Sequence, residues 1–244
     1  MNISALIFMY HKIGTPKGSG LQRNLYVSPR VFRLQMRYLK LAGFRVVSMD
    51  DIVRLTRGED VGSKPVALTF DDGFRNFYEH ALPVLQEFRY PATVYAVSDL
   101  IGRDDAWETC GDATREPLMT EPQLRECREY GIEIGSHTKS HPRLTGLSPE
   151  RLRDELRGSR QALEERLGAP VRHCCYPYGD CDAAVVAAAA GAGYVSGTTT
   201  QRGRVHVGDN PLTLRRTFIR NATNPFLFLL RLHTGYEDRK AQRS

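Results

Sequence analysis

The feature of this sequence that most limits its fold is the alternation of short apolar runs with longer helical segments. Eight runs have the length and residue types of β-strands, and most are followed by a segment with helical periodicity. Strands that alternate with helices form βαβ units, whose strands lie parallel in one sheet. The sequence therefore predicts an α/β protein with a closed or nearly closed barrel. The expected strands are 5–10, 44–47, 66–70, 93–97, 132–135, 171–176, 194–197 and 214–219.

Helix boundaries are marked by capping residues. Ser28 followed by Pro29 is a typical helix start, and Gly43 marks the expected end of that helix. The stretch 102–118 has little pattern and holds the only Trp, Trp107, so it is a candidate functional loop. No low-complexity linker or repeat interrupts residues 1–244, which are expected to form one domain. The other expected helices are 76–89, 120–131, 148–168 and 182–191.

The composition is that of an ordinary globular protein with a modest basic excess. Lys and Arg number 34 against 28 Asp and Glu, a net charge of +6. A basic solvated surface is the simplest interpretation; peripheral association with anionic lipid or a lipid-linked sugar stays open. No basic block interleaved with aromatic residues indicates nucleic-acid binding.

The N-terminus lacks the features of a signal peptide, no apolar run is long enough to span a bilayer, and the odd cysteine count favours reduced thiols. Together these predict a cytoplasmic protein.

Two adjacent carboxylates follow the expected strand 66–70. The segment 69–73 reads Thr-Phe-Asp-Asp-Gly, which places Asp71 and Asp72 at the carboxyl end of that strand. Active sites of α/β barrels assemble at this edge. Adjacent carboxylates repel each other unless a cation or a proton intervenes. The pair indicates either an acidic metal site or, more simply, the Asp-Gly chemistry of a tight turn.

Two histidines follow the expected strand 132–135 in the same way. His137 and His141 are four residues apart, and Pro142 favours a looped turn over a helix there. Two neutral imidazoles with one carboxylate would form a three-ligand metal site that leaves positions for water and substrate. Two surface histidines near a loop are the alternative. Because both motifs fall at strand ends, the metal centre is the favoured interpretation.

A third motif ends the expected strand 171–176. Tyr176, Pro177, Tyr178 and Gly179 form a turn that could wall a sugar-sized pocket, and a backbone N–H there could face an oxyanion. A plain turn with buried aromatic rings is the alternative.

The three motifs, in this order, resemble those of the polysaccharide deacetylases, the NodB-homology group of carbohydrate esterase family 4. The similarity extends from the segment 9–11 to about residue 200. The resemblance implies a distorted (β/α) barrel and a metal-dependent hydrolase that removes N-acetyl groups. Its substrate would be an N-acetylated saccharide or a sugar-containing biosynthetic intermediate.

The resemblance also implies roles for individual residues. Asp72, His137 and His141 match the metal ligands of the family, and Asp71 matches its catalytic base. The segment 176–179 matches the turn at the substrate and the oxyanion. One carboxylate and two imidazoles suit Zn²⁺, although Co²⁺, Ni²⁺, Mn²⁺ or Fe²⁺ would also bind.

The sequence departs from the family pattern in two places. Many members carry an Arg before the proline motif that orients the base, whereas this chain has Cys175 there and Arg172 nearby. The usual proton donor is a His in a Leu-x-x-His pattern, which His233 fits, although its surroundings look helical. His11, at the end of the first strand, is the rival candidate for the donor or for a substrate contact.

Two other functions stay open at this point. The same barrel could hydrolyse a small linear or cyclic amide, or it could bind carbohydrate without turning it over. Asp71 argues against a pure binding protein, because such a protein needs no base beside its metal ligand.

Overall fold

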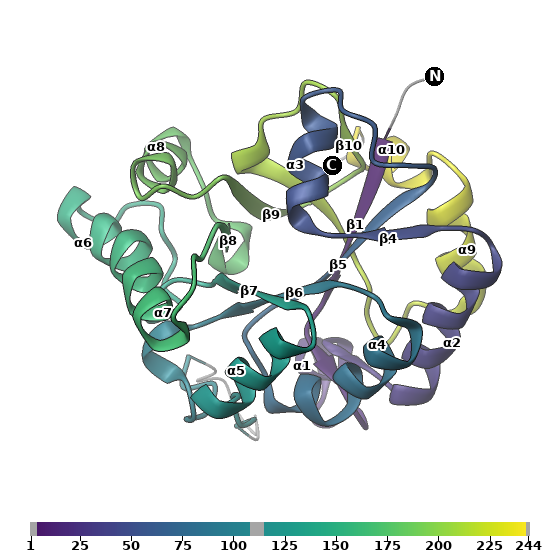
Figure 1. Cartoon of the computed structure of the whole chain (residues 1–244), viewed down its shortest axis with the longest axis horizontal. Coiled ribbons are helices and arrows are strands. Elements are labelled where there is room, and N and C mark those ends of the chain that lie inside the picture. The colour runs from purple at the N-terminus through teal and green to yellow at the C-terminus, as the bar shows by residue number, and fades with distance from the viewer. Residues whose placement is uncertain (1–3, 108–114, 243–244) are drawn as a thin grey trace.

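Seven parallel strands form a closed ring in the computed structural model, which describes residues 4–107 and 115–242. The ring order is β1-β11-β9-β8-β7-β6-β5, and β5 pairs back onto β1 over five residue pairs from Leu6–Val66 to Tyr10–Phe70. The predicted barrel is therefore confirmed (Figure 1). The ring strands are β1 Ser4–Tyr10, β5 Pro65–Phe70, β6 Ala92–Ala96, β7 Ile132–Ser136, β8 His173–Cys175, β9 Ser196–Arg202 and β11 Leu214–Phe218.

In the described part of the chain, four short strands lie outside this ring. β4 pairs in parallel with β5, β10 pairs antiparallel with β1, and β2 pairs with β3 in a sheet of their own. Only β4 was expected from the sequence, since two-residue strands carry no readable alternation. The outer strands are β2 Lys12–Ile13, β3 Tyr26–Val27, β4 Arg45–Val47 and β10 Val205–His206.

Helices cover the outside of the ring (Figure 1). The expected helix after Ser28 is α2, whose N-cap hydroxyl accepts a hydrogen bond from the Val31 backbone N–H. A helix that the sequence analysis missed, α3, begins with a capping box between Ser48 and Asp51. The α-helices are α1 Gly20–Asn24, α2 Pro29–Leu41, α3 Met49–Thr56, α4 Leu82–Phe88, α5 Glu121–Glu129, α6 Pro149–Arg153, α7 Ser159–Leu167, α8 Ala183–Gly191, α9 Pro225–His233 and α10 Tyr236–Ala241. The π-helical turns Phe77–Ala81 and Asp154–Gly158 lead into α4 and α7, and short 3-10 turns lie at Ser98–Leu100, Pro177–Gly179 and Pro211–Thr213.

The core lies on both faces of the ring strands. Every residue of β5 and β6 is buried, as expected for parallel strands with helices outside and side chains inside the barrel. Gly135 of β7 is required by this packing, because a Cβ atom there would lie 2.5 Å from the Tyr95 ring and 2.9 Å from the His173 carbonyl oxygen.

A buried histidine ties strands together at the end of the barrel where β7 and β8 begin. The His173 Nδ1 lies 2.7 Å from the Ser196 hydroxyl, and its Nε2 lies 3.0 Å from a Glu133 oxygen and 3.3 Å from an Asp50 oxygen. Burial alone would lower the pKa of the His173 imidazole, but the two carboxylates outweigh it and raise that pKa above 6.5.

This network predicts a pH-dependent stability. Because the folded-state pKa of His173 is raised, its stabilisation is complete below about pH 6.5 and is lost as the pH rises through the raised value. The melting temperature of the wild type should therefore fall over that range by a few degrees more than that of a His173→Gln variant. Thermal unfolding of both proteins across neutral pH measures the difference. Parallel curves would contradict a charged His173 in this network.

Candidate active site

The two acidic and two histidine residues predicted from the sequence meet at the carboxyl ends of β5 and β7. Asp71 and Asp72 follow Phe70, and His137 follows Ser136. The segment from His137 to His141 is a loop, as expected from the proline that follows it. All four side chains are buried. The strand-end placement is thus what brings residues 65 positions apart into one site.

The backbone around these residues is unusual. Among the described residues, six non-glycine residues have a positive φ, and four of them belong to this site: Asp72, Thr138, His141 and Tyr178. Left-handed conformations of this kind cost about 1–3 kcal/mol each and persist where the surrounding structure enforces them. Gly73 also has a positive φ of 74°, and it packs against Ala96 of β6.

Asp72, His137 and His141 form a compact donor group. Asp72 Oδ1 lies 3.3 Å from the His137 Nε2 and 3.5 Å from the His141 Nε2. The His137 Nδ1 lies 2.7 Å from the Cys175 carbonyl oxygen, which fixes that ring and directs its Nε2 toward Asp72. Burial alone would raise the pKa of the Asp72 carboxyl, but the histidines beside it hold that pKa well below its ordinary range. The group offers one carboxylate and two imidazole nitrogens, a donor set that fits a divalent metal.

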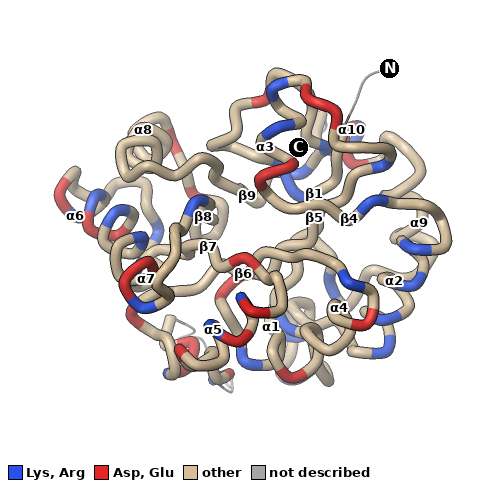
Figure 2. Tube along the Cα trace, viewed as in Figure 1, with Lys and Arg blue, Asp and Glu red and all other residues tan. Residues whose placement is uncertain are grey.

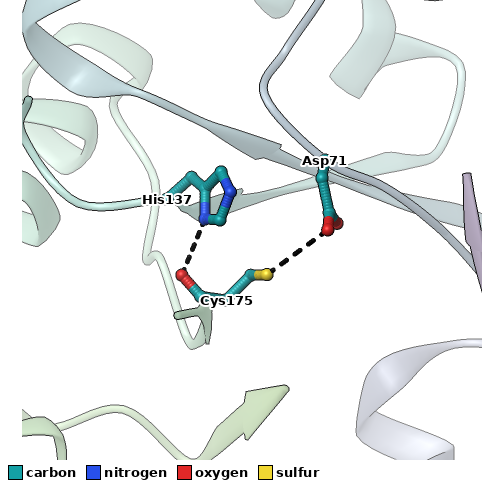
Figure 3. A group of neighbouring side chains, drawn as sticks. All are labelled: Asp71, His137 and Cys175. Atoms are coloured by element: carbon teal, nitrogen blue, oxygen red, sulfur yellow. Dashed lines mark hydrogen bonds between the residues drawn. The ribbon is translucent and has the colours of Figure 1, made fainter. Parts of the chain in front are cut away.

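A second group of possible ligands, Asp71, His137 and Cys175, fits a cation poorly (Figure 3). Both oxygens of Asp71 already accept hydrogen bonds from Arg216, and the same guanidinium lies 3.1 Å from the Cys175 sulfur. A metal there would sit against a buried positive charge. The His137 Nδ1 is also engaged by the Cys175 carbonyl oxygen, as the dashed line in Figure 3 shows. The geometry therefore favours Asp72, His137 and His141 as the metal-binding group.

Arg216 is a site residue that the sequence analysis missed. From β11 its Nη1 and Nη2 donate to the two oxygens of Asp71 at 2.6 and 2.7 Å, and its Nε donates to the Thr199 carbonyl oxygen at 2.8 Å. Burial would raise the pKa of the Asp71 carboxyl, but the guanidinium outweighs it and holds that pKa below its usual range. Arg216 supplies the charge expected before the proline motif, where Cys175 stands. One signal in the sequence could have identified Arg216. It is a basic residue at a position of the expected strand 214–219 that faces the barrel interior.

His11 is brought to the same site from the end of β1. Its Nε2 lies 3.9 Å from an Asp71 oxygen, and its ring packs against Phe218 with 5.2 Å between centroids. Its Nδ1 is buried without a hydrogen-bond partner among the described residues. Burial lowers the pKa of the His11 imidazole, and the carboxylates of Asp71 and Asp72 oppose that effect.

Aromatic rings border the donor group on one side. The Trp107 ring stacks on His141 with 4.4 Å between centroids, and the Tyr178 ring meets His141 edge-on at 4.8 Å. Tyr178 is exposed, whereas Tyr176 is buried and donates to the Leu212 carbonyl oxygen. In the turn 176–179, Tyr178 is thus the side chain that can meet a substrate. The predicted loop 102–118 lies partly outside the described residues, and only its two ends, which carry Trp107 and Leu118, are placed.

His233 does not lie at this site, which corrects its expected role as proton donor. It ends α9 on the outside of the barrel, where its Nε2 lies 2.7 Å from the Tyr38 hydroxyl and its ring packs on Phe44. The Leu-x-x-His pattern lies within helix α9, and this helix places the His233 side chain on the outside of the barrel. Arg172 is also elsewhere, paired with Asp50 at the opposite end of the barrel.

Comparison with known proteins assigns the chain to a family. Residues 58–197 match the sequence profile of the polysaccharide deacetylases. The chain belongs to the polysaccharide deacetylase family. The solved deacetylase PplD of Streptococcus pyogenes, in complex with acetate, superposes with a TM-score of 0.82 at 26% identity, over 96% of this chain and 100% of that one.

Two curated relatives give the extent of the similarity. YxkH of Bacillus subtilis, assigned to the polysaccharide deacetylases, is 29% identical over 81% of this chain and 64% of its own length. Poly-beta-1,6-N-acetyl-D-glucosamine N-deacetylase of Escherichia coli is 35% identical over 48% of this chain and 18% of its own. The chain thus spans less than two thirds of either relative. Within the described part of the chain, every helix is too short or too polar to cross a bilayer.

The buried pair of Asp71 and Arg216 predicts a large effect on stability. Replacement of one partner leaves an uncompensated buried charge, which typically costs about 3–5 kcal/mol. Arg216→Met should therefore lower the free energy of unfolding by about that amount. A double variant, Asp71→Asn with Arg216→Met, should recover part of the loss because both charges are gone. Denaturant unfolding of the metal-free proteins tests this, and wild-type stability in Arg216→Met would contradict the pair.

Proposed function

We propose that the protein is a metal-dependent deacetylase that hydrolyses the N-acetyl group of an N-acetylated saccharide or a sugar-containing intermediate. The observation that carries the proposal is the division of two adjacent carboxylates between different partners. Asp72 faces His137 and His141, whereas Asp71 faces Arg216. The names of the relatives support the substrate class, and the acetate bound to the streptococcal deacetylase is the expected product.

In this proposal, Asp72, His137 and His141 hold the metal. One carboxylate and two imidazoles suit Zn²⁺, which we propose as the bound ion; Co²⁺, Ni²⁺, Mn²⁺ and Fe²⁺ fit the same donors. When bound, such an ion lowers the pKa of a bound water and polarises the amide carbonyl. The hydrogen bond from the His137 Nδ1 to the Cys175 carbonyl oxygen would leave the Nε2 lone pair free to bind such an ion.

Asp71 is the proposed general base. A base must be ionised before it can accept a proton, and Arg216 keeps the Asp71 carboxylate in that state despite its burial. The two hydrogen bonds from Arg216 also fix the plane of the carboxylate. Asp71 would thus take the proton from the attacking water without competing for the metal.

His11 is the proposed donor to the departing amine. It is the described histidine that lies beside Asp71 and outside the metal-binding group, with its Nε2 3.9 Å from an Asp71 oxygen. The proton that Asp71 takes from water could therefore pass to this imidazole and from it to the nitrogen of the departing amine. Tyr178 and Trp107, both against His141, would flank the acetylated sugar. The oxyanion contact from the Tyr178 backbone N–H stays a prediction.

Substitution of the two carboxylates should separate catalysis from metal binding. Asp71→Asn should lower acetate release by roughly 10²–10⁴-fold, the usual contribution of a general base, and should keep its metal. Asp72→Asn should lose both metal and activity. Acetate release from an N-acetylated oligosaccharide and metal content per chain are measured together, with Asp50→Asn, at the far end of the barrel, as the matched control. Undiminished turnover by Asp71→Asn would rule out this mechanism.

A leaving-group test examines His11. His11→Gln should slow hydrolysis of the N-acetylated sugar by roughly 10²-fold or more, because the amine cannot depart unprotonated. The same variant should hydrolyse 4-nitrophenyl acetate nearly as fast as the wild type, since nitrophenolate leaves without a proton. His80→Gln, at an exposed position, is the matched control. Equal loss on both substrates would show that His11 is not the donor.

A further inference from the structure

We propose that the outer face of α2 and α9 is a docking surface for an anionic lipid bilayer. Among the described residues, eight large hydrophobic side chains are exposed, and four of them lie on these two helices. Leu41 is 75% exposed, Phe226 73%, Leu34 55% and Val31 38%. Apolar residues gathered on one face, rather than scattered singly, mark an interaction site. This inference is independent of the proposed function.

The exposed side of α2 carries two stripes of different chemistry. Arg30, Arg33, Arg37 and Lys40 are spaced i, i+3, i+7 and i+10, which puts them in one row on a helix. A second row, one residue further on and with the same spacing, is apolar: Val31, Leu34, Tyr38 and Leu41. The third side of the helix is buried against the core through Phe32, Gln35, Met36 and Leu39. Every exposed residue from Arg30 onward in α2 is thus a cation or a hydrophobe.

The apolar row of α2 faces α9, which lies beside it (Figure 1). A groove of about 240 Å³ runs between them and is lined mostly by apolar side chains. On α9, Phe226, Leu229 and Leu230 recur at i, i+3 and i+4 and are exposed or half-buried. The residues that line the groove are Val31, Leu34, Gln35, Tyr38, Thr223, Pro225, Phe228 and Leu229.

The basic row of α2 is mostly unpaired. Arg33 forms an ion pair with Glu87 of α4, whereas Arg30, Arg37 and Lys40 have no carboxylate within 4 Å among the described residues; the Lys40 ammonium lies over the Phe88 ring, 5.8 Å from its centroid. Lys and Arg residues recur along this helix in Figure 2. These three cations lie beside a continuous apolar row. A partner that fits both must have negative charges next to an apolar region.

A bilayer of anionic lipid provides that combination. Helices that lie in the membrane interface place cations among the phosphates and bury an adjacent apolar stripe among the acyl chains. The long side chains of Arg and Lys can extend to the phosphates while the Leu and Phe side chains enter the acyl region. A second copy of this chain would fit less well, because a two-fold interface would bring the same surface, with a second basic row and no added negative charge, to the contact.

The surface is also placed to leave the active site accessible. The segment between Phe218, which packs on His11, and Pro225, where α9 begins, runs from the active-site end of the barrel. His233, at the other end of α9, lies near Pro65, where β5 begins. The helix α9 therefore runs along the side of the barrel, and a membrane against it would lie beside the mouth of the barrel without covering it.

Vesicle sedimentation tests the proposal. Wild-type protein should sediment with phosphatidylcholine vesicles that contain phosphatidylglycerol, and high salt should release it. Leu34→Glu and Phe226→Glu should abolish binding, and each cation removed in Arg30→Gln and Arg37→Gln should weaken it roughly fivefold. Val207→Glu is the matched control, because Val207 is 51% exposed beside Gly58, just after α3. All these variants should keep the wild-type rate on a soluble substrate.

Three outcomes would overturn the proposal. The first is absence of binding to the anionic vesicles by the wild type. The second is equal binding to pure phosphatidylcholine, which would remove the role of the basic row. The third is a concentration-dependent dimer that Leu34→Glu disrupts, which would assign this face to a second copy of the chain. Binding that Val207→Glu retains and Leu34→Glu loses would support the bilayer.

Discussion

The rest of the site depends on the buried ion pair between Arg216 and Asp71. Two charges taken out of water carry a desolvation cost of several kcal/mol each, which their attraction offsets only with good geometry and further hydrogen bonds. Both conditions are met, because the pair is bidentate and the Arg216 Nε–H donates to the Thr199 carbonyl oxygen. The pair also joins β11 to the end of β5 across the interior of the barrel. The closed ring is what brings the two partners, 145 positions apart, into contact.

This ion pair gives two adjacent carboxylates different chemistry. Without Arg216, Asp71 would be a second anionic ligand beside Asp72, and a metal would draw both carboxylates toward itself. With its two oxygens held by the guanidinium, Asp71 is ionised, and its hydrogen bonds go to Arg216 rather than to the metal-binding group. The left-handed backbone of Asp72, with φ at 75°, turns its side chain to the other side, toward His137 and His141. Local backbone strain and a distant arginine together separate the base from the ligand.

Most of the fold and the centre of the site could be predicted from the sequence, because the signals that indicate them lie within short stretches of the chain. The strands β5 and β7 were predicted from their own residues. Asp71 and Asp72 follow β5 directly, and His137 and His141 lie in the loop after β7, so strand order alone places them at one edge. Apart from α3, whose capping box was a local signal, the failures were non-local or concerned very short elements. Nothing near Arg216 in the sequence indicates that it contacts Asp71, and the His233 pattern gave no information on the direction in which α9 carries that ring. The two-residue strands are fixed by pairing partners rather than by their own residues.

The two ends of the barrel differ in stability: groups that cost free energy gather at one end, and stabilising ion pairs gather at the other. Among the described residues at the carboxyl ends of the strands, four non-glycine residues hold left-handed conformations and several buried groups lack hydrogen-bond partners, such as the Nδ1 atoms of His11 and His141. Each of these costs free energy. At the opposite end, His173, Glu133, Asp50 and Arg172 form a network of opposite charges that stabilises the fold. A ring of seven hydrogen-bonded strands couples the ends mechanically, so stability gained where the strands begin can support strain where they finish. A protein with an open sheet would have a free edge through which that strain could relax.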